Sequence, residues 1–151
     1  MTGGRSKSTG IAVLAVMVFV LVGAAAAQAG QARLKVGSTL AGMVITNTSG
    51  YALMMFPKEG HTLDRCIRIK TCMSDWPPVT TTGRPLAGPG IDPKLVGTIP
   101  YRGRLREVTY AGWPLHRYKF AYSAQSSVLD IGIRQFGGNW YALAPNGKIV
   151  K

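Results

Sequence analysis

Glycine and proline interrupt this chain so often that long helices are disfavoured. The 151 residues include 19 glycines and 9 prolines, and all but four of these glycines and prolines follow Ala29. Proline removes a backbone donor and glycine gives the backbone extra freedom, so both residues end helices and mark turns. Hydrophobic residues still make up 46% of the sequence, which is too many for a disordered chain. A chain of this length fits one ordinary domain.

Between these breaks, short runs rich in β-branched and aromatic residues are typical of β-strands. The runs are residues 34–47, 51–56, 96–101, 105–110, 113–120, 140–144 and 148–150. Long irregular loops are expected at 57–78 and 80–93, and only 123–133 has the composition of a short helix. The sequence therefore predicts a mainly β fold, a compact domain of antiparallel strands and hairpins with long Gly/Pro-rich loops.

Short turn sequences predict how these strands connect. Residues 145–147 contain Asn-Gly, the strongest short hairpin signal, and 102–103 lie between two strand-like runs. Both positions therefore predict hairpins. We expect Gly37 and Gly42 to form bulges within the first run, because glycine inside a strand often marks one.

The N-terminal segment has the three parts of a secretory signal peptide. Two basic residues precede an apolar run at 11–22, and a small-x-small sequence ends at Ala29. The alternative is a retained membrane anchor, but the apolar run is shorter than the ~20 residues that a spanning helix needs. We expect residues 1–29 to be removed and residues 30–151 to form a single domain that is periplasmic or secreted.

Two segments of the chain share a short pattern. Residues 50–58 and 112–119 both read glycine, aromatic, x, leucine, x, x, aromatic, and they begin 62 positions apart at Gly50 and Gly112. Four shared positions also arise by chance. If the repeat is genuine, the domain consists of two related β-units packed on each other.

Several motifs occur together in one order. Cys66 precedes Cys72, which is followed by Met-Ser-Asp-Trp-Pro-Pro; residues 108–115 read Val-Thr-Tyr-Ala-Gly-Trp-Pro-Leu, and residues 140–147 read Trp-Tyr-Ala-Leu-Ala-Pro-Asn-Gly. With the repeat segment at 50–58, this order resembles the bacterial secreted-repeat family, predicted lipoproteins named for a Yx(FWY)xxD motif. The resemblance covers most of the chain after the signal peptide. It implies an exported β-protein, and it implies no reaction, because the biochemical role of that family is undefined.

The chain resembles a non-lipidated member of this family with a degenerate motif. No cysteine is present near the N-terminus to carry a lipid, and the two tyrosine positions of the motif hold Met54 and His116. Glu59 replaces the acid of the first copy, and Ala121 stands at the acid position of the second. The positions that correspond to the family motifs, including those with replaced residues, are Leu53, Met54, Phe56, Glu59, Trp76, Pro77, Pro78, Tyr110, Gly112, Trp113, Pro114, Leu115, His116, Tyr118 and Trp140.

The two cysteines are expected to form a structural disulfide. Oxidation is the default for cysteines in an exported protein, and a bridge between Cys66 and Cys72 would contribute about 2 kcal/mol. The alternative is a redox pair or a metal site. Five residues between the cysteines do not favour a redox pair, which is typically Cys-x-x-Cys.

The tryptophans and the soft ligands each leave two interpretations. Trp76 and Trp113, both followed by proline, are either core residues, which we expect, or a stacking platform for a ligand. Copper or haem iron would accept side chains from a set of methionines and histidines. The set is Met54, Met55, Met73, His61 and His116. Its spacing does not support a metal, and neighbours in a strand such as Met54 and Met55 point to opposite faces.

Charge is the last signal. The chain has 18 lysines and arginines against 6 acids, a net charge of +12. Arg102, Arg104 and Arg106 would project from one face of an extended strand unless Gly103 breaks the row, and they are the candidate anion-binding residues. A second basic group lies beside the cysteine loop. It consists of Arg65, Arg68 and Lys70. An exported basic surface would meet an anionic envelope component rather than nucleic acid, and the alternative is a solvated face.

No catalytic arrangement is found in the sequence. The spacing pairs no nucleophile with a histidine and an orienting acid, and residues 137–139 do not have the pattern of a phosphate loop. We therefore expect a non-enzymatic, exported cell-envelope binding or interaction module, whose partner is an anionic envelope component or another envelope protein. No cofactor, metal or transmembrane segment after processing is expected. The alternative is a periplasmic metal- or haem-handling protein that uses methionine and histidine ligands.

Overall fold

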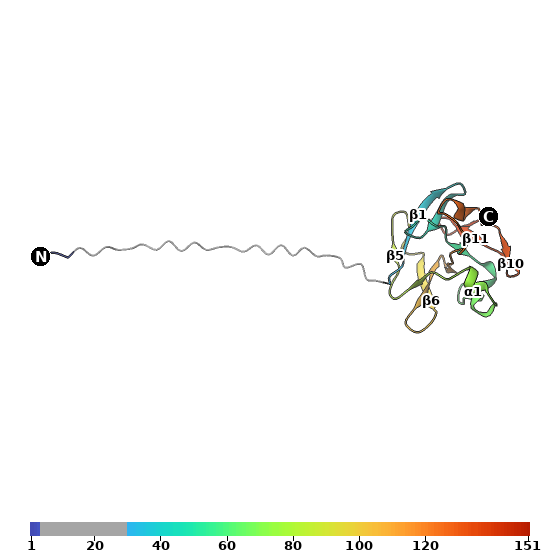
Figure 1. The fold of residues 1–151 in the computed structure, drawn as a ribbon, viewed down its shortest axis with the longest axis horizontal. Coiled ribbons are helices and arrows are strands. Elements are labelled where there is room, and N and C mark those ends of the chain that lie inside the picture. Colours follow the sequence, from blue (N-terminus) through green and yellow to red (C-terminus); the bar gives the residue numbers. More distant parts are fainter. Residues whose placement is uncertain (4–29) are drawn as a thin grey trace.

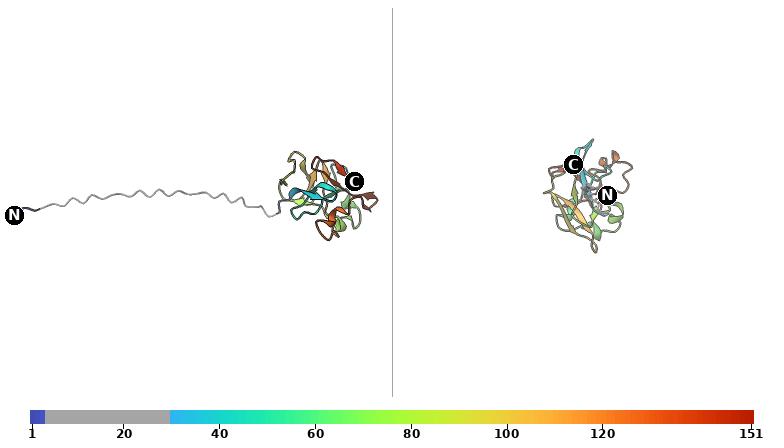
Figure 2. Two further views of the ribbon diagram at one scale, coloured as in Figure 1. Left: turned by 90° about the horizontal axis from the view of Figure 1, so that it is seen from above. Right: turned by 90° about the vertical axis from the view of Figure 1, so that its left-hand side faces the viewer.

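The computed structural model describes residues 1–3 and 30–151. Apart from its first three residues, the predicted signal peptide lies outside the described residues. In the described part, no helix has the length and apolar character needed to cross a membrane. Residues 30–151 form one rounded body, seen in Figure 1 and from two further directions in Figure 2.

Short strands make up most of the regular structure of this body. The described strands are β1 (Arg33–Thr39), β2 (Gly42–Thr46), β3 (Met54–Met55), β4 (Thr80–Thr81), β5 (Leu86–Ala87), β6 (Val96–Pro100), β7 (Arg106–Tyr110), β8 (Trp113–Pro114), β9 (Arg134–Gln135), β10 (Gly138–Asn139), β11 (Tyr141–Leu143) and β12 (Ile149–Val150). They pair as β2-β1-β5, β10-β9, β12-β11-β3 and β4-β7-β6, with β8 also on β7. All pairs between these strands are antiparallel except β1 with β5.

In residues 30–151, helical structure is limited to single turns. They are α1 (Cys72–Asp75) and 3₁₀ helices at Pro57–Glu59, Cys66–Arg68 and Ser126–Val128. Ser126–Val128 lies within 123–133, where a short helix was predicted, and the other three lie in the predicted long loop at 57–78. The predicted mainly β, compact fold is thus confirmed.

Both predicted hairpins are present. β6 pairs with β7 across residues 101–105, and β11 pairs with β12 across residues 144–148. The two predicted bulges are wrong, because residues 33–46 form a regular hairpin rather than one bulged strand. Gly37 lies opposite Val44 in register, and Gly42, at φ +88°, follows the turn between β1 and β2. A Cβ on Gly37 would lie 2.7 Å from Cγ2 of Thr46, so close approach across the hairpin explains this glycine.

The two copies of the repeat pattern meet at equivalent residues. Met54 and His116 hold the same position in the two copies. The Met54 N–H donates to the His116 carbonyl at 2.8 Å, and the His116 N–H donates to the Met54 carbonyl at 2.8 Å. Met54 also pairs with Ala142, which follows Trp140 in the sequence. His116 pairs with Pro78, which follows Trp76 at the same spacing. The two segments therefore contact each other reciprocally, as two related units would.

The aromatic core follows the same reciprocal arrangement. Four rings are stacked in the order Phe56, Trp140, Trp76 and Tyr118, with centroid distances of 4.6, 4.0 and 4.5 Å. Phe56 and Tyr118 are equivalent in the repeat, and each packs on a tryptophan contributed by the other half of the chain. Trp76 and Trp140 are fully buried, whereas Trp113, which was also expected in the core, is only partly buried. The two halves therefore share one core.

The predicted disulfide is present and buried. Cys66 and Cys72 are bridged, with their Cα atoms 5.4 Å apart. Cys66 begins a 3₁₀ helix and Cys72 begins α1, so the bridge holds two single turns together. Such short turns have little stability of their own, and the bridge keeps the 57–78 loop against the core.

Candidate functional site

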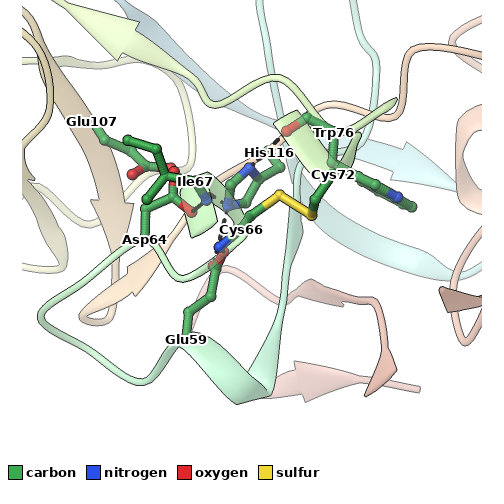
Figure 3. Close-up of polar contacts among 8 residues, drawn as sticks. All are labelled: Glu59, Asp64, Cys66, Ile67, Cys72, Trp76, Glu107 and His116. Carbon is green, nitrogen blue, oxygen red and sulfur yellow. Dashed lines mark hydrogen bonds and ion pairs between the residues drawn. A yellow bond between two sulfur atoms is a disulfide. The ribbon is translucent and has the colours of Figure 1, made fainter. Parts of the chain in front are cut away.

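Half of the acids of this basic chain gather around one buried histidine. Glu59, Asp64 and Glu107 are three of only six acidic residues, and they surround His116 (Figure 3). Each of these four residues is at most 8% exposed. Buried charges are costly unless they are paired or bind a metal. We call these four residues the His116 centre.

Four separate parts of the fold supply the His116 centre. His116 lies just beyond β8 and is fixed by its backbone bridges to Met54 and Pro78. Glu59 ends the 3₁₀ helix that follows β3, and Glu107 lies within β7. Asp64 precedes the first cysteine of the disulfide. The centre therefore forms only when both halves of the chain are packed together.

The imidazole of His116 is held in one orientation. Its Nδ1 lies 3.0 Å from the Trp76 carbonyl oxygen, and since that oxygen can only accept, Nδ1 carries a proton. Nε2 faces Glu59 Oε2 at 3.1 Å and Glu107 Oε1 at 3.4 Å. The ring thus turns its second nitrogen to the carboxylates.

The carboxylates are only partly satisfied. Glu59 Oε1 accepts the Cys66 N–H at 3.2 Å, and Asp64 Oδ1 accepts the Ile67 N–H at 3.2 Å. Asp64 Oδ2 and both Glu107 oxygens accept no hydrogen bond from the described residues, although they are buried. A buried carboxylate without donors must gain a proton or a cation.

The surroundings favour bound protons. Burial raises the pKa of Glu107 to about 8, and the other carboxylates add to this effect. Burial also raises the pKa of Glu59. Burial alone would lower the pKa of His116, but the hydrogen bond and charge of Glu59, with the charges of the other two carboxylates, raise it to about 9.

We expect the stability of the metal-free protein to fall as the pH rises. Between pH 4.5 and about 8 the folded chain keeps the Glu107 proton that the unfolded chain has lost, and His116 behaves likewise between 6.5 and about 9. Each extra proton held by the folded state lowers the free energy of unfolding by about 1.4 kcal/mol per pH unit. Urea unfolding from pH 5 to pH 9 with a chelator measures this slope. A flat or rising profile contradicts it, and Glu107→Gln is expected to make the slope shallower.

The His116 centre also has donors that suit a cation. Ligand atoms of Asp64, Glu107 and His116 all lie within 4.8 Å of one another. A second group combines Glu59, Cys66 and His116, but the sulfur of Cys66 is in the disulfide and cannot serve as a thiolate ligand. The available donors are therefore one imidazole nitrogen and carboxylate oxygens.

A cavity of about 900 Å³ opens beside the His116 centre. Its apolar lining consists of Phe56, Leu63, Ile67, Ile69 and Phe136, and its basic lining consists of Lys58, Arg65 and Arg68. Asp64 belongs to both the cavity and the centre. We call this cavity the disulfide-loop pocket, because most of its lining comes from residues 63–69.

The methionines and histidines of the predicted soft-ligand set are not gathered in one place. Met54 lies in the core cluster with the stacked tryptophans, whereas Met55 lies in the cluster with Tyr110. His61 is exposed and packs against Trp113, with ring centroids 4.1 Å apart. His116 belongs to a carboxylate centre instead. The structure thus gives the histidine different neighbours from those the soft-ligand hypothesis needs.

The predicted row of arginines is broken. Arg102 and Arg104 lie in the bend and turn around Gly103, which has a φ of +55°. Only Arg106 lies in a strand, and its Nε donates to Thr98 Oγ1 at 2.6 Å. Gly103 therefore breaks the row, which is the alternative that the sequence left open. Arg65 and Arg68 line the disulfide-loop pocket.

Sequence reasoning singled out Glu59 and His116 as motif positions but missed Asp64 and Glu107. One signal was available: Glu107 is an acid within the predicted strand at 105–110, beside Val108. A carboxylate in a strand that packs on both faces needs a partner. The partner is far away in the sequence, so the signal predicts a buried acid without saying what it meets.

Comparison with known proteins adds no assignment to these sites. No family model, no curated protein and no solved structure matches this chain. The resemblance to the secreted-repeat family stays a prediction from the motifs.

Proposed function

We propose that this chain is an exported, non-enzymatic cell-envelope binding module whose ligand is the acyl chain and phosphate headgroup of an envelope lipid. The observation that carries the proposal is the disulfide-loop pocket, which joins an apolar lining to basic side chains. A cavity of about 900 Å³ is within the range of small-molecule sites. Five apolar residues provide the lining against which an acyl chain packs.

The basic side chains give the pocket its preference for anions. Lys58, Arg65 and Arg68 are exposed and can donate to phosphate oxygens. The net charge, which is +12 for the full sequence and +10 once residues 1–29 with Arg5 and Lys7 are removed, attracts anionic surfaces before contact. Long-range attraction and local donors therefore favour the same class of ligand.

The disulfide restrains the loop that lines the pocket. The bridge between Cys66 and Cys72 fixes the segment that carries Arg65 and Arg68. A ligand that binds a fixed loop does not have to order it, and less conformational entropy is lost on binding. Under this proposal the buried disulfide serves ligand binding, because it holds the loop that lines the pocket.

Removing two charges from the pocket is expected to weaken ligand binding. Arg65→Gln with Arg68→Gln should lower the affinity for monomeric dodecyl phosphate at least about 10-fold, because each lost charge-assisted hydrogen bond contributes about 1.5–3 kcal/mol. Titration calorimetry at 50 mM and 300 mM salt measures the affinity and its screening. Dodecyl maltoside, which has an uncharged headgroup, should bind both proteins equally.

A charge-matched variant provides the control. Arg102→Gln with Arg104→Gln removes the same charge from the turn between β6 and β7. This variant should keep the affinity of the parent within about 2-fold at the higher salt concentration, because salt screens charges outside the pocket. Equal losses of affinity in both variants would mean that binding depends on net charge rather than on the two arginines of the pocket. No binding of dodecyl phosphate by the parent protein would refute the proposal.

A further inference from the structure

The orientation of His116 is the one that metal-binding histidines adopt. Such histidines donate their second ring N–H to a carbonyl or carboxylate, which fixes the tautomer and aims the free nitrogen at the ion. Nδ1 of His116 donates to the Trp76 carbonyl at 3.0 Å. In the neutral ring, the Nε2 lone pair therefore points at Glu59 and Glu107 (Figure 3).

The distances within the His116 centre fit ligands of one ion. Two ligands at about 2.1 Å from a tetrahedral ion lie about 3.4 Å apart. Nε2 of His116 is 3.4 Å from Glu107 Oε1 and 3.1 Å from Glu59 Oε2. A ligand oxygen of Asp64 lies within 4.8 Å of those of Glu107 and His116. Nε2 of His116 therefore already lies near coordination spacing from one oxygen of each glutamate, and Asp64 supplies a further oxygen nearby.

The unsatisfied oxygens require bound protons or a cation. Glu107 is fully buried, and neither of its oxygens accepts a hydrogen bond; Asp64 Oδ2 also lacks a donor. A histidine that only had to be satisfied structurally would need one acceptor at Nε2, not two carboxylates with further oxygens unpaired. A bound cation would supply what these oxygens lack.

We propose that the His116 centre binds one divalent transition-metal ion through His116, Glu107 and Asp64, with Glu59 as the fourth ligand. One imidazole nitrogen with carboxylate oxygens suits zinc or manganese better than calcium, which prefers six or more oxygens. Asp64 also lines the disulfide-loop pocket, so an ion has a path from solvent. This site is separate from the lipid proposal and does not depend on it.

The test is a metal titration of protein expressed from the full sequence and treated with a chelator. Calorimetry with Zn²⁺ should show one ion per chain, and Ca²⁺ should bind at least about 100-fold more weakly, since the ligand set lacks the oxygens calcium needs. Co²⁺ in place of Zn²⁺ should give the visible absorption of a tetrahedral site. This readout uses the parent chain alone, so it does not depend on how a variant folds.

Variants then assign the ligands. Glu107→Gln keeps the shape of the side chain and should weaken Zn²⁺ binding at least about 10-fold, because a deprotonated ligand is lost. His61→Gln, at the exposed histidine against Trp113, should change nothing. Absence of stoichiometric Zn²⁺ and Mn²⁺ binding by the parent chain would overturn the proposal, and the centre would then hold protons only. Undiminished binding by Glu107→Gln at unchanged stoichiometry would overturn the ligand assignment.

Discussion

Replacing His116 with Met should destabilise the metal-free fold by about 3 kcal/mol, and adding Glu107→Val should recover at least about 1 kcal/mol of that loss. The single change leaves three buried carboxylates without the imidazole they face. Removing one partner of a buried ionic group is strongly destabilising, whereas replacing the group by apolar residues is often neutral or stabilising. The second substitution removes the carboxylate whose oxygens accept no hydrogen bond.

The other half of the chain provides the model for this double variant. Met54 is the counterpart of His116. Leu53 and Leu115, also counterparts, donate their N–H groups to Ile45 at 2.9 Å and Val108 at 3.0 Å. The residues that precede these two acceptors are Val44 and Glu107, and Val44 packs in the apolar core with Met54. The first half of the chain therefore already holds a valine and a methionine at the positions that the double variant would change.

Urea unfolding of the parent, both single variants and the double variant, with a chelator at pH 7, completes the cycle. The same cycle with His61→Met in place of His116→Met is the control, and it should be additive. Additivity within about 0.5 kcal/mol in the His116 cycle would mean that the two side chains are not energetically coupled. That result would contradict the description of the His116 centre as one interacting unit.

Trp140→Ala should lower the free energy of unfolding by about 4 kcal/mol. Trp140 is fully buried in the middle of the stack, so its loss leaves a void between Phe56 and Trp76. Its Nε1 has no hydrogen-bond partner. Trp140→Phe, which loses area but no hydrogen bond, should therefore be the milder change.

Chemical denaturation measures both variants, and the near-UV circular dichroism of the folded state reports the stacked rings. Trp113→Ala is the matched control, because Trp113 is only partly buried and packs on exposed His61. It should cost clearly less than Trp140→Ala. Equal losses at Trp113 and Trp140 would contradict the central place given to the four-ring stack.

The features predicted from the sequence depend on short stretches of chain. The Asn-Gly turn at 145–147 specifies its hairpin locally, and Cys66 and Cys72 are too close in sequence to need a fold to meet. The bulges at Gly37 and Gly42 failed for the opposite reason. A glycine in a strand-like run predicts a bulge, a close approach or a turn; Thr46 across the hairpin decides for Gly37, whereas Gly42 follows the turn between β1 and β2 at φ +88°.

The His116 centre could not be predicted because its members lie far apart in the chain. Glu59 and His116 are 57 residues apart, and nothing in the local sequence of either names the other. The repeat pattern did place Met54 and His116 at equivalent positions. The alternative of methionine and histidine ligands followed from the residue types, whereas the structure pairs His116 with the carboxylates of Glu59 and Glu107.

The reciprocal contact between Met54 and His116 has a consequence for symmetry. A homodimer of one half would carry every residue of the interface twice, so an acid or imidazole placed there would appear in two copies. In one continuous chain the two copies can differ. Val44 and Met54 keep one side apolar, while Glu107 and His116 make the other polar. The desolvation cost of buried ionisable groups is then borne at one place only, and the apolar counterpart is left to stabilise the fold that holds them.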